Sequence, residues 1–259
     1  MTGTVLVWFL KTVLLVGSAL LAAKLYRSGL YRRYPIFFAY FVFRVPNSIW
    51  PLLVDDISSP EYQKIWICTE LIVLVFYVLL VRELFRLVLE KYKGLYTLGR
   101  WAMYVAMTIA VIISGLSLIP RINPSMPQRS KIMFYVIATE RGANTALIIF
   151  VAVLMLFLSR YPVRLSRNVR IYAWIYSIFF LSNTFVLLMR TLFGLRNADA
   201  FNDAHLAVAA VCVLSWLFLL TPQGAEATSQ PAPPGNQYEH RLLTQLDSLN
   251  AALLKVGRR

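Results

Sequence analysis

The sequence predicts an all-α fold, a polytopic membrane helix bundle with seven transmembrane helices. Composition is the first observation behind this prediction, because 59% of the 259 residues are hydrophobic and only 15% are charged. Such a chain has too little polar surface to cover a soluble globule. The second observation is a series of long apolar stretches, and the third is an uneven distribution of basic residues between them. The lipid bilayer is therefore the expected solvent.

Seven apolar stretches are candidates to cross the hydrocarbon core of about 30 Å as helices. They lie near residues 4–23, 36–54, 63–82, 101–120, 132–158, 171–190 and 206–221. The last stretch is short and contains Ser215 and Trp216, so the alternative is six spans and one interfacial helix. We interpret the first stretch as an uncleaved helix, because the basic cluster that follows it would resist translocation as a mature N-terminus.

The basic residues predict the orientation of the bundle. Cytoplasmic loops of membrane proteins are enriched in Lys and Arg, which favours an N-terminus outside and a cytoplasmic C-terminus in a plasma membrane such as the bacterial inner membrane. The opposite side has few Lys and Arg residues, and acidic residues such as Asp55 and Asp56 dilute them. Seventeen of the 26 Lys and Arg residues fall on the predicted cytoplasmic side: Lys24, Arg27, Arg32, Arg33, Arg82, Arg86, Lys91, Lys93, Arg100, Arg160, Arg164, Arg167, Arg170, Arg241, Lys255, Arg258 and Arg259.

The chain divides into three parts by composition. Residues 1–221 form the seven-helix transmembrane domain, 222–237 are a flexible linker rich in Pro and Ala, and 238–259 are a cytoplasmic amphipathic helix. An apolar seam of about two heptads is too short for a stable coiled coil alone, so we expect residues 238–256 to bind a second copy, a cytoplasmic protein or the membrane surface. The seam consists of Leu242, Leu246, Leu249 and Leu253.

Two further features concern the arrangement of the helices. The third stretch continues with helical apolar spacing over 81–91, which predicts an interfacial helix that acts either as a lever or as a basic anchor on lipid headgroups. The second and sixth stretches both contain an Asn followed by Ser or Thr, at Asn47 and Asn183, eleven residues after Ile36 and Tyr172. One interpretation is a repeat of three helices, a linker helix and three helices.

Five ionisable side chains lie inside the predicted spans, where charges are costly and usually face the bundle interior. They are Lys11, Arg44, Glu70, Glu140 and Arg141. From the predicted ends of the spans, Arg44 lies near the midplane and the other four lie in the outer half. A rise of about 1.5 Å per residue then places all five in one layer, within reach of long side chains. We therefore predict a polar cluster in the outer half of the bundle.

Neighbouring polar residues share helix faces with these charges, as Tyr77 does with Glu70 and Asn144 with Glu140. Pro46 adds a helix irregularity of the kind found at midplane binding sites. Two interpretations stay open: the charges only fix helix pairing, or they line a pocket that is open to the outside. Three positive and two negative charges would favour a small anionic ligand. The candidate ligand-binding residues are Arg44, Asn47, Glu70, Glu140, Arg141, Asn144 and Asn183.

Catalytic and metal-binding motifs are missing from the sequence. Its histidines are His205 and His240, and its cysteines, Cys68 and Cys212, both fall inside predicted spans without zinc-ligand spacing. No nucleophile elbow, phosphate-binding loop or dinucleotide fingerprint occurs. We therefore expect no enzyme activity, no cofactor and no metal. The net charge of +14 lies at helix ends, which favours anionic lipid at the cytoplasmic face and not nucleic acid.

Three hypotheses about function follow. The leading one is an integral membrane sensor or receptor-like protein that binds a small ligand in the outer-half pocket and signals to a separate cytoplasmic partner. The second is a small-solute or proton-coupled transporter. The third is a structural membrane assembly subunit whose charges fix helix pairing. Seven helices alone do not decide between them, and residues 206–221 contain no lysine for a retinal Schiff base.

Overall fold

The computed structural model describes most of the chain. The described residues are 2–53, 60–89, 93–116, 128–160, 166–193, 198–225 and, in the tail, 244–245, 248 and 250–251.

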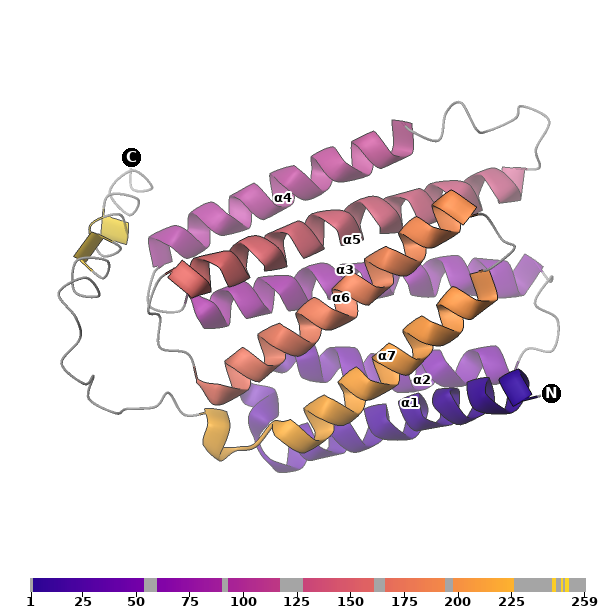
Figure 1. The fold of residues 1–259 in the computed structure, drawn as a ribbon, viewed down its shortest axis with the longest axis horizontal. Helices are drawn as coiled ribbons and strands as arrows, with labels where there is room; N and C mark the ends of the chain where they lie inside the picture. The colour runs from indigo at the N-terminus through magenta and orange to yellow at the C-terminus, as the bar shows by residue number, and fades with distance from the viewer. Residues whose placement is uncertain are drawn as a thin grey trace.

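Seven α-helices make up most of the described residues (Figure 1), which contain no strand. The all-α prediction is confirmed. Two short 3-10 helices accompany them, η1 (Leu30–Arg32) and η4 (Gln223–Ala225). Gly29 precedes η1 with φ 72°, a left-handed conformation that favours glycine, and so allows the tight turn after the first helix. The helices are α1 (Thr2–Arg27), α2 (Pro35–Leu53), α3 (Pro60–Val88), α4 (Lys93–Leu116), α5 (Gln128–Arg160), α6 (Arg167–Phe193) and α7 (Ala198–Leu219).

Four of the helices have described stretches that are long and apolar enough to cross a membrane: Val5–Arg27, Glu61–Val88, Arg167–Val186 and Ala200–Leu219. Large apolar side chains also point outward from the bundle, as expected where lipid replaces water. The structure therefore supports a membrane protein. The count of seven spans and the orientation stay predictions.

Neighbouring helices pack in chain order from α1 to α7, and α7 packs against α1. Helix α3 packs against its chain neighbours α2 and α4 and also against α5 and α6. Successive helices run in opposite directions, so α1, α3, α5 and α7 all end where α2, α4 and α6 begin (Figure 1). We call this end of the bundle the basic end, because it carries Lys24, Arg32, Arg33, Arg86 and Arg170.

The contacts between helices have one feature that the proposed repeat predicts. The third helix of the first half, α3, packs against α5, and the third helix of the second half, α7, packs against α1. A parallel repeat would place each half against the other in this way. The repeat itself stays a prediction.

Aromatic side chains form the centre of the core next to the basic end. Phe37 of α2 packs edge-on against Tyr172 of α6, at 4.9 Å between ring centroids, and against Trp216 of α7 at 5.3 Å. Tyr176 of α6 lies 4.8 Å from the Trp216 ring. Such pairs contribute about 0.5–1.5 kcal/mol each beyond the area they bury. The cluster ties α2, α6 and α7 together and separates the basic end from the polar interior beyond it.

The end of α3 differs from the sequence prediction. The segment 81–91 was expected to lie on lipid headgroups, but residues 83–89, apart from Arg86, are buried in the bundle. The apolar face of this segment packs against neighbouring helices and Glu83 has hydrogen-bond partners inside the bundle, so the exposed Arg86 is the residue of 83–89 that can reach lipid headgroups.

The linker and the tail lie mostly outside the described residues, as do the four leucines of the predicted seam. Within the predicted linker, the structure describes residues 222–225, where η4 is found. In the tail, Oδ1 of Asn250 accepts a hydrogen bond of 2.8 Å from the backbone N–H of Gly94. This contact joins the tail to the first turn of α4.

Candidate functional site

The predicted ligand-binding residues lie on four helices, and all of them are buried or half-buried. Lys11 of α1 behaves differently. Its side chain is exposed, and Nζ lies 5.7 Å from the centroid of the Trp8 ring on the same helix. The expectation that Lys11 joins the interior cluster was wrong. The predicted residues are Arg44 and Asn47 on α2, Glu70 on α3, Glu140, Arg141 and Asn144 on α5, and Asn183 on α6.

Tyr77 of α3 interacts electrostatically with three of these residues. Its ring is buried and packs edge-on against Phe180 of α6, at 5.3 Å between centroids. Its phenol interacts electrostatically with Arg44 of α2, Glu70 of α3 and Glu140 of α5. Charged side chains on α2, α3 and α5 therefore contribute to the electrostatic environment of this buried phenol.

Arg44 is held by phenol groups. Nη1 donates a hydrogen bond to the hydroxyl of Tyr40, and the guanidinium carbon lies 5.7 Å from the centroid of the same ring. The guanidinium also interacts electrostatically with the phenols of Tyr77 and Tyr176. Its Nε is buried and has no hydrogen-bond partner. Neutral phenols orient this guanidinium but do not neutralise its charge.

A small cavity lies beside Arg44, between α2, α6 and α7. Its volume is about 10 Å³, close to that of a single water molecule. The lining residues are Tyr40, Phe41, Arg44, Tyr176, Phe179, Val213 and Trp216.

Asn144 of α5 is the most unusual of the predicted residues. It is fully buried, and neither its Oδ1 nor its Nδ2 has a hydrogen-bond partner. It lies one turn from Glu140 on the same face of α5. A buried unpaired polar group costs about 1–3 kcal/mol, so such a group in a native protein calls for an explanation such as a water molecule or a ligand.

The remaining predicted residues have different surroundings. Oδ1 of Asn47 accepts a hydrogen bond of 2.8 Å from Trp50 Nε1, one turn along α2, so its amide oxygen has a local partner. Asn183 of α6 is buried. Next to it, Oγ1 of Thr184 is buried without a hydrogen-bond partner. Arg141 is half-buried beside Glu140.

Sequence reasoning missed Glu83, the most extensively bonded buried side chain at the basic end. Its Oε1 accepts a hydrogen bond of 3.0 Å from the backbone N–H of Ile36, and its Oε2 accepts one of 3.1 Å from Phe37. The hydroxyl of Tyr172 donates to Oε2 at 3.3 Å. Glu83 of α3 therefore caps the first turn of α2, where backbone donors have no partner within the helix and a negative charge is favoured.

Two sequence signals could have revealed this cap. The residues before and at the start of α2, Tyr34 and Pro35, have no side chain of the type that caps a helix, so the first N–H groups need another acceptor. Glu83 is flanked on its helix by Leu80 and Leu87, at spacings of three and four residues. An acidic residue on an apolar helix face is a candidate for a buried partner.

Asn168 forms a second polar lock at the basic end. It is fully buried at the start of α6, its Nδ2 donates to the carbonyl of Thr221 at 2.6 Å, and its Oδ1 accepts from the Thr221 N–H at 3.3 Å. Gly224 is required nearby, because a Cβ atom added there would lie 2.4 Å from Oδ1 of Asn168. In addition, Nζ of Lys24 donates to the carbonyl of Leu217. These bonds fasten α1 and α6 to the end of α7.

The described residues contain no group of three or more His, Cys, Asp or Glu side chains that could hold a metal ion. Comparison with known proteins gives no relative to set beside this geometry: no protein-family model, no curated protein sequence and no solved structure matches the chain.

Proposed function

We propose that this protein is an integral membrane sensor, a receptor-like protein of the plasma membrane that binds a small anionic ligand in its polar interior. In this proposal the membrane is a bacterial inner membrane, crossed seven times, with the N-terminus outside. The ligand site lies in the outer half around Tyr77, and the signal passes to a separate cytoplasmic partner. No catalytic step is involved.

The unpaired carboxamide of Asn144 is the observation that carries this proposal. Mid-helix backbone groups are bonded within their own helix, so a buried amide there must find a side chain, a water molecule or a ligand. Both polar atoms of Asn144 lack a protein partner. A ligand that bonds to this amide would recover most of the cost of burying it.

The charge around the site supports an anionic ligand. Arg44 contributes a guanidinium whose Nε has no hydrogen-bond partner and whose nearest contact is the neutral phenol of Tyr40. A carboxylate or phosphate group would offer this guanidinium a charged acceptor. Glu70 and Glu140, which also interact with Tyr77, would then select against a second negative charge or bind an amino group of the ligand.

The contacts of α3 offer a route from this site to the basic end. Glu70 and Tyr77 lie on α3 near the site, and Glu83 on the same helix caps the start of α2. A ligand that shifts α3 relative to α2 would therefore move this cap. The output surface in this proposal is the basic end together with residues 238–256, which bind a cytoplasmic protein or a second copy of the chain.

A thermal-shift screen of the purified full chain in detergent tests the proposal. The probes are sodium salts of chloride, phosphate, acetate and glutamate, and a short-chain fatty acid. We expect one class of anion to stabilise the protein, since a ligand at one hundred times its Kd adds about 2.7 kcal/mol. The shift should disappear in Arg44→Gln and persist in Arg170→Gln, which removes an exposed charge from the basic end. An equal shift in both variants would contradict the site.

A transporter is the second candidate, favoured by the packing of α3 against α5 and of α7 against α1. Parallel repeats packed against each other are found in carriers, with the substrate site near the midplane. Liposomes that contain the protein separate the two functions. Binding of the stabilising anion without flux supports a sensor, whereas Arg44-dependent flux of that anion supports a transporter.

A further inference from the structure

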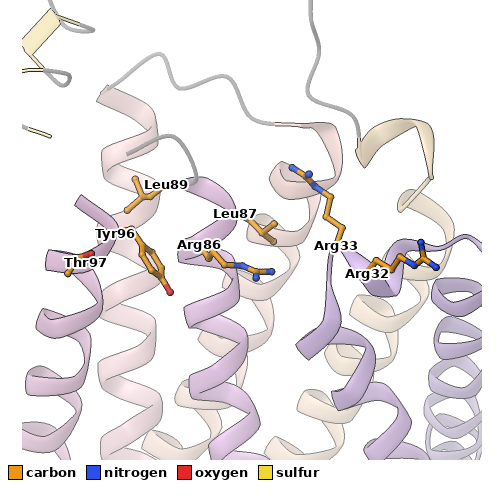
Figure 2. Close-up of a pocket in the computed structure, with 7 residues that line it drawn as sticks. All are labelled: Arg32, Arg33, Arg86, Leu87, Leu89, Tyr96 and Thr97. Atoms are coloured by element: carbon orange, nitrogen blue, oxygen red, sulfur yellow. The ribbon is translucent and has the colours of Figure 1, made fainter. Parts of the chain in front are cut away.

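A second candidate binding site lies at the basic end, far along α3 from Tyr77. It is an open cleft of about 580 Å³ between η1, the end of α3 and the first turns of α4. Figure 2 shows Arg86 extending from α3 toward the side where Arg33 lies, with Tyr96 and Thr97 on the other side. We call it the basic cleft. It is lined by Arg32, Arg33, Arg86, Leu87, Leu89, Tyr96 and Thr97.

The charge of Arg86 is only weakly compensated. Its side chain is 52% exposed, and its Nη2 lies 4.0 Å from Oε1 of Glu83, beyond hydrogen-bond distance. Both oxygens of Glu83 already accept hydrogen bonds from the backbone of Ile36 and Phe37. The guanidinium of Arg86 therefore keeps donors for a further acceptor in the cleft.

Two further arginines lie around the cleft, Arg32 and Arg100. Nε of Arg32 donates to the neutral hydroxyl of Tyr31 at 3.2 Å, which leaves its charge in place. The guanidinium of Arg100 lies 5.9 Å from the centroid of the Tyr96 ring, on the α4 side of the cleft. None of the lining residues that the structure describes is acidic. Clustered arginines favour a phosphate group, because the planar guanidinium can donate two parallel hydrogen bonds to its oxygens.

The cleft also has an apolar side. Leu87 and Leu89 are 8% and 5% exposed and lie beside the arginines, and the Tyr96 ring adds a further apolar face. A free phosphate ion would leave this surface unused. A ligand that carries a phosphate at one end and hydrocarbon at the other would fill both parts.

The position of the cleft indicates where such a ligand comes from. It lies at the end of α3, a helix long and apolar enough to cross a membrane. Phospholipid headgroups occupy this depth, and basic pockets at the ends of transmembrane helices bind anionic headgroups. We propose that the basic cleft binds the phosphate headgroup of an anionic phospholipid, with Arg86 on the phosphate, Arg32 and Arg33 adding positive charge at the rim, and Leu87 and Leu89 against the glycerol and the first acyl carbons.

Native mass spectrometry of the full chain released from detergent micelles tests this site. The probes are phosphatidylglycerol and phosphatidylcholine at equal concentrations. We expect one phosphatidylglycerol molecule to stay bound in preference to phosphatidylcholine. The Arg32→Gln/Arg86→Gln variant should lose about 25-fold in affinity, since each arginine near a headgroup contributes about fivefold. The control variant Arg167→Gln/Arg170→Gln removes two exposed charges from the start of α6 and should bind within about twofold of the unmodified protein.

Two further arms complete the test. Arg32→Gln alone should lose about fivefold in affinity at an unchanged melting temperature, because Arg32 does not contact Glu83. The proposal would be overturned if phosphatidylglycerol binding fell only in variants with a lowered melting temperature. It would also be overturned if binding fell equally in the control variant. Competition with sodium phosphate separates the sources of phosphate. Displacement of the lipid by an equal concentration of inorganic phosphate would overturn the lipid assignment, and resistance to it would support the lipid.

Discussion

The two polar regions of this bundle use similar side chains but differ in how their polar atoms are paired. At the basic end, Glu83 and Asn168 are buried and bond to backbone groups of other helices or turns. In the interior around Tyr77, the buried amide of Asn144 and the Nε of Arg44 have no hydrogen-bond partner. Glu83 and Asn168 are therefore bonded by the protein itself, whereas Asn144 and Arg44 have unused hydrogen-bonding capacity.

The difference follows from where each region lies along the helices. Helix ends leave backbone N–H and C=O groups without partners, so a side chain buried there finds them within reach. In the middle of a helix those groups are already bonded, and a buried polar side chain depends on other side chains, water or a ligand. Glu83 and Asn168 therefore have a structural role, and the unpaired amide of Asn144 is a candidate for contact with a ligand.

Glu83→Ala should have the largest effect on stability. It leaves the Ile36 and Phe37 N–H groups and the Tyr172 hydroxyl buried without their acceptor, which should lower the free energy of unfolding by about 3–5 kcal/mol. Glu83→Gln keeps one acceptor oxygen and should cost less. Thermal unfolding in detergent measures both. If Glu83→Ala melted at the same temperature as the unmodified protein, the claim that this cap stabilises the fold would be contradicted.

Asn168→Ala should have the second largest effect. The variant leaves the N–H and carbonyl groups of Thr221 without the amide that bonds both of them, at a cost of about 2–3 kcal/mol. The matched control is Asn47→Ala, which removes an amide that bonds a side chain on its own helix. The same unfolding assay should rank Asn168→Ala well below Asn47→Ala. The reverse ranking would contradict the account of the basic end.

Lys24→Met should have a smaller effect. It keeps most of the aliphatic chain but loses the hydrogen bond from Nζ to the carbonyl of Leu217, worth about 1 kcal/mol. Lys11→Met on the same helix removes an exposed charge and should change stability by less than about 0.5 kcal/mol. Equal effects of the two substitutions in chemical unfolding would show that the bond from α1 to α7 contributes nothing.

Thr184→Val should have the smallest effect on stability. Whether stability rises or falls tests the account of the interior around Tyr77. The substitution preserves shape and removes a buried hydroxyl that has no hydrogen-bond partner, so stability should stay the same or rise by about 0.5 kcal/mol. Thr145→Val on α5 is the comparison, since its hydroxyl donates to the carbonyl of Arg141 at 2.8 Å. A clear loss of stability in Thr184→Val would show that this hydroxyl has a partner.

Much of the fold could be predicted from the sequence, because long apolar stretches determine where helices lie in a membrane protein. The stretch predicted at 171–190 lies inside α6, for example, and the one at 36–54 nearly coincides with α2. Arg44, Glu70 and Glu140 each interact electrostatically with Tyr77, and the predicted cluster of these charges stays a prediction.

The hydrogen bonds at the basic end depend on which helices are neighbours. The positions of the helix ends in the sequence do not show which helices pack together. Glu83 bonds to Phe37, 46 residues away in the sequence, and to Ile36, 47 residues away. Asn168 bonds to Thr221, 53 residues away. Lys11 was misplaced for a related reason. Depth along α1 was known, but the side of the helix that faces the bundle was not, and Lys11 lies on the exposed side.

The most direct test of the central claim is the melting temperature of Asn144→Leu, measured with and without the anion that stabilises the unmodified protein. We expect the variant to be at least as stable as the unmodified protein without ligand, because a buried unpaired amide has been replaced by an apolar side chain of similar size. We also expect that the anion no longer raises the melting temperature. A variant that is less stable without ligand and shows an undiminished ligand shift would contradict the claim that the unpaired interior is the binding site.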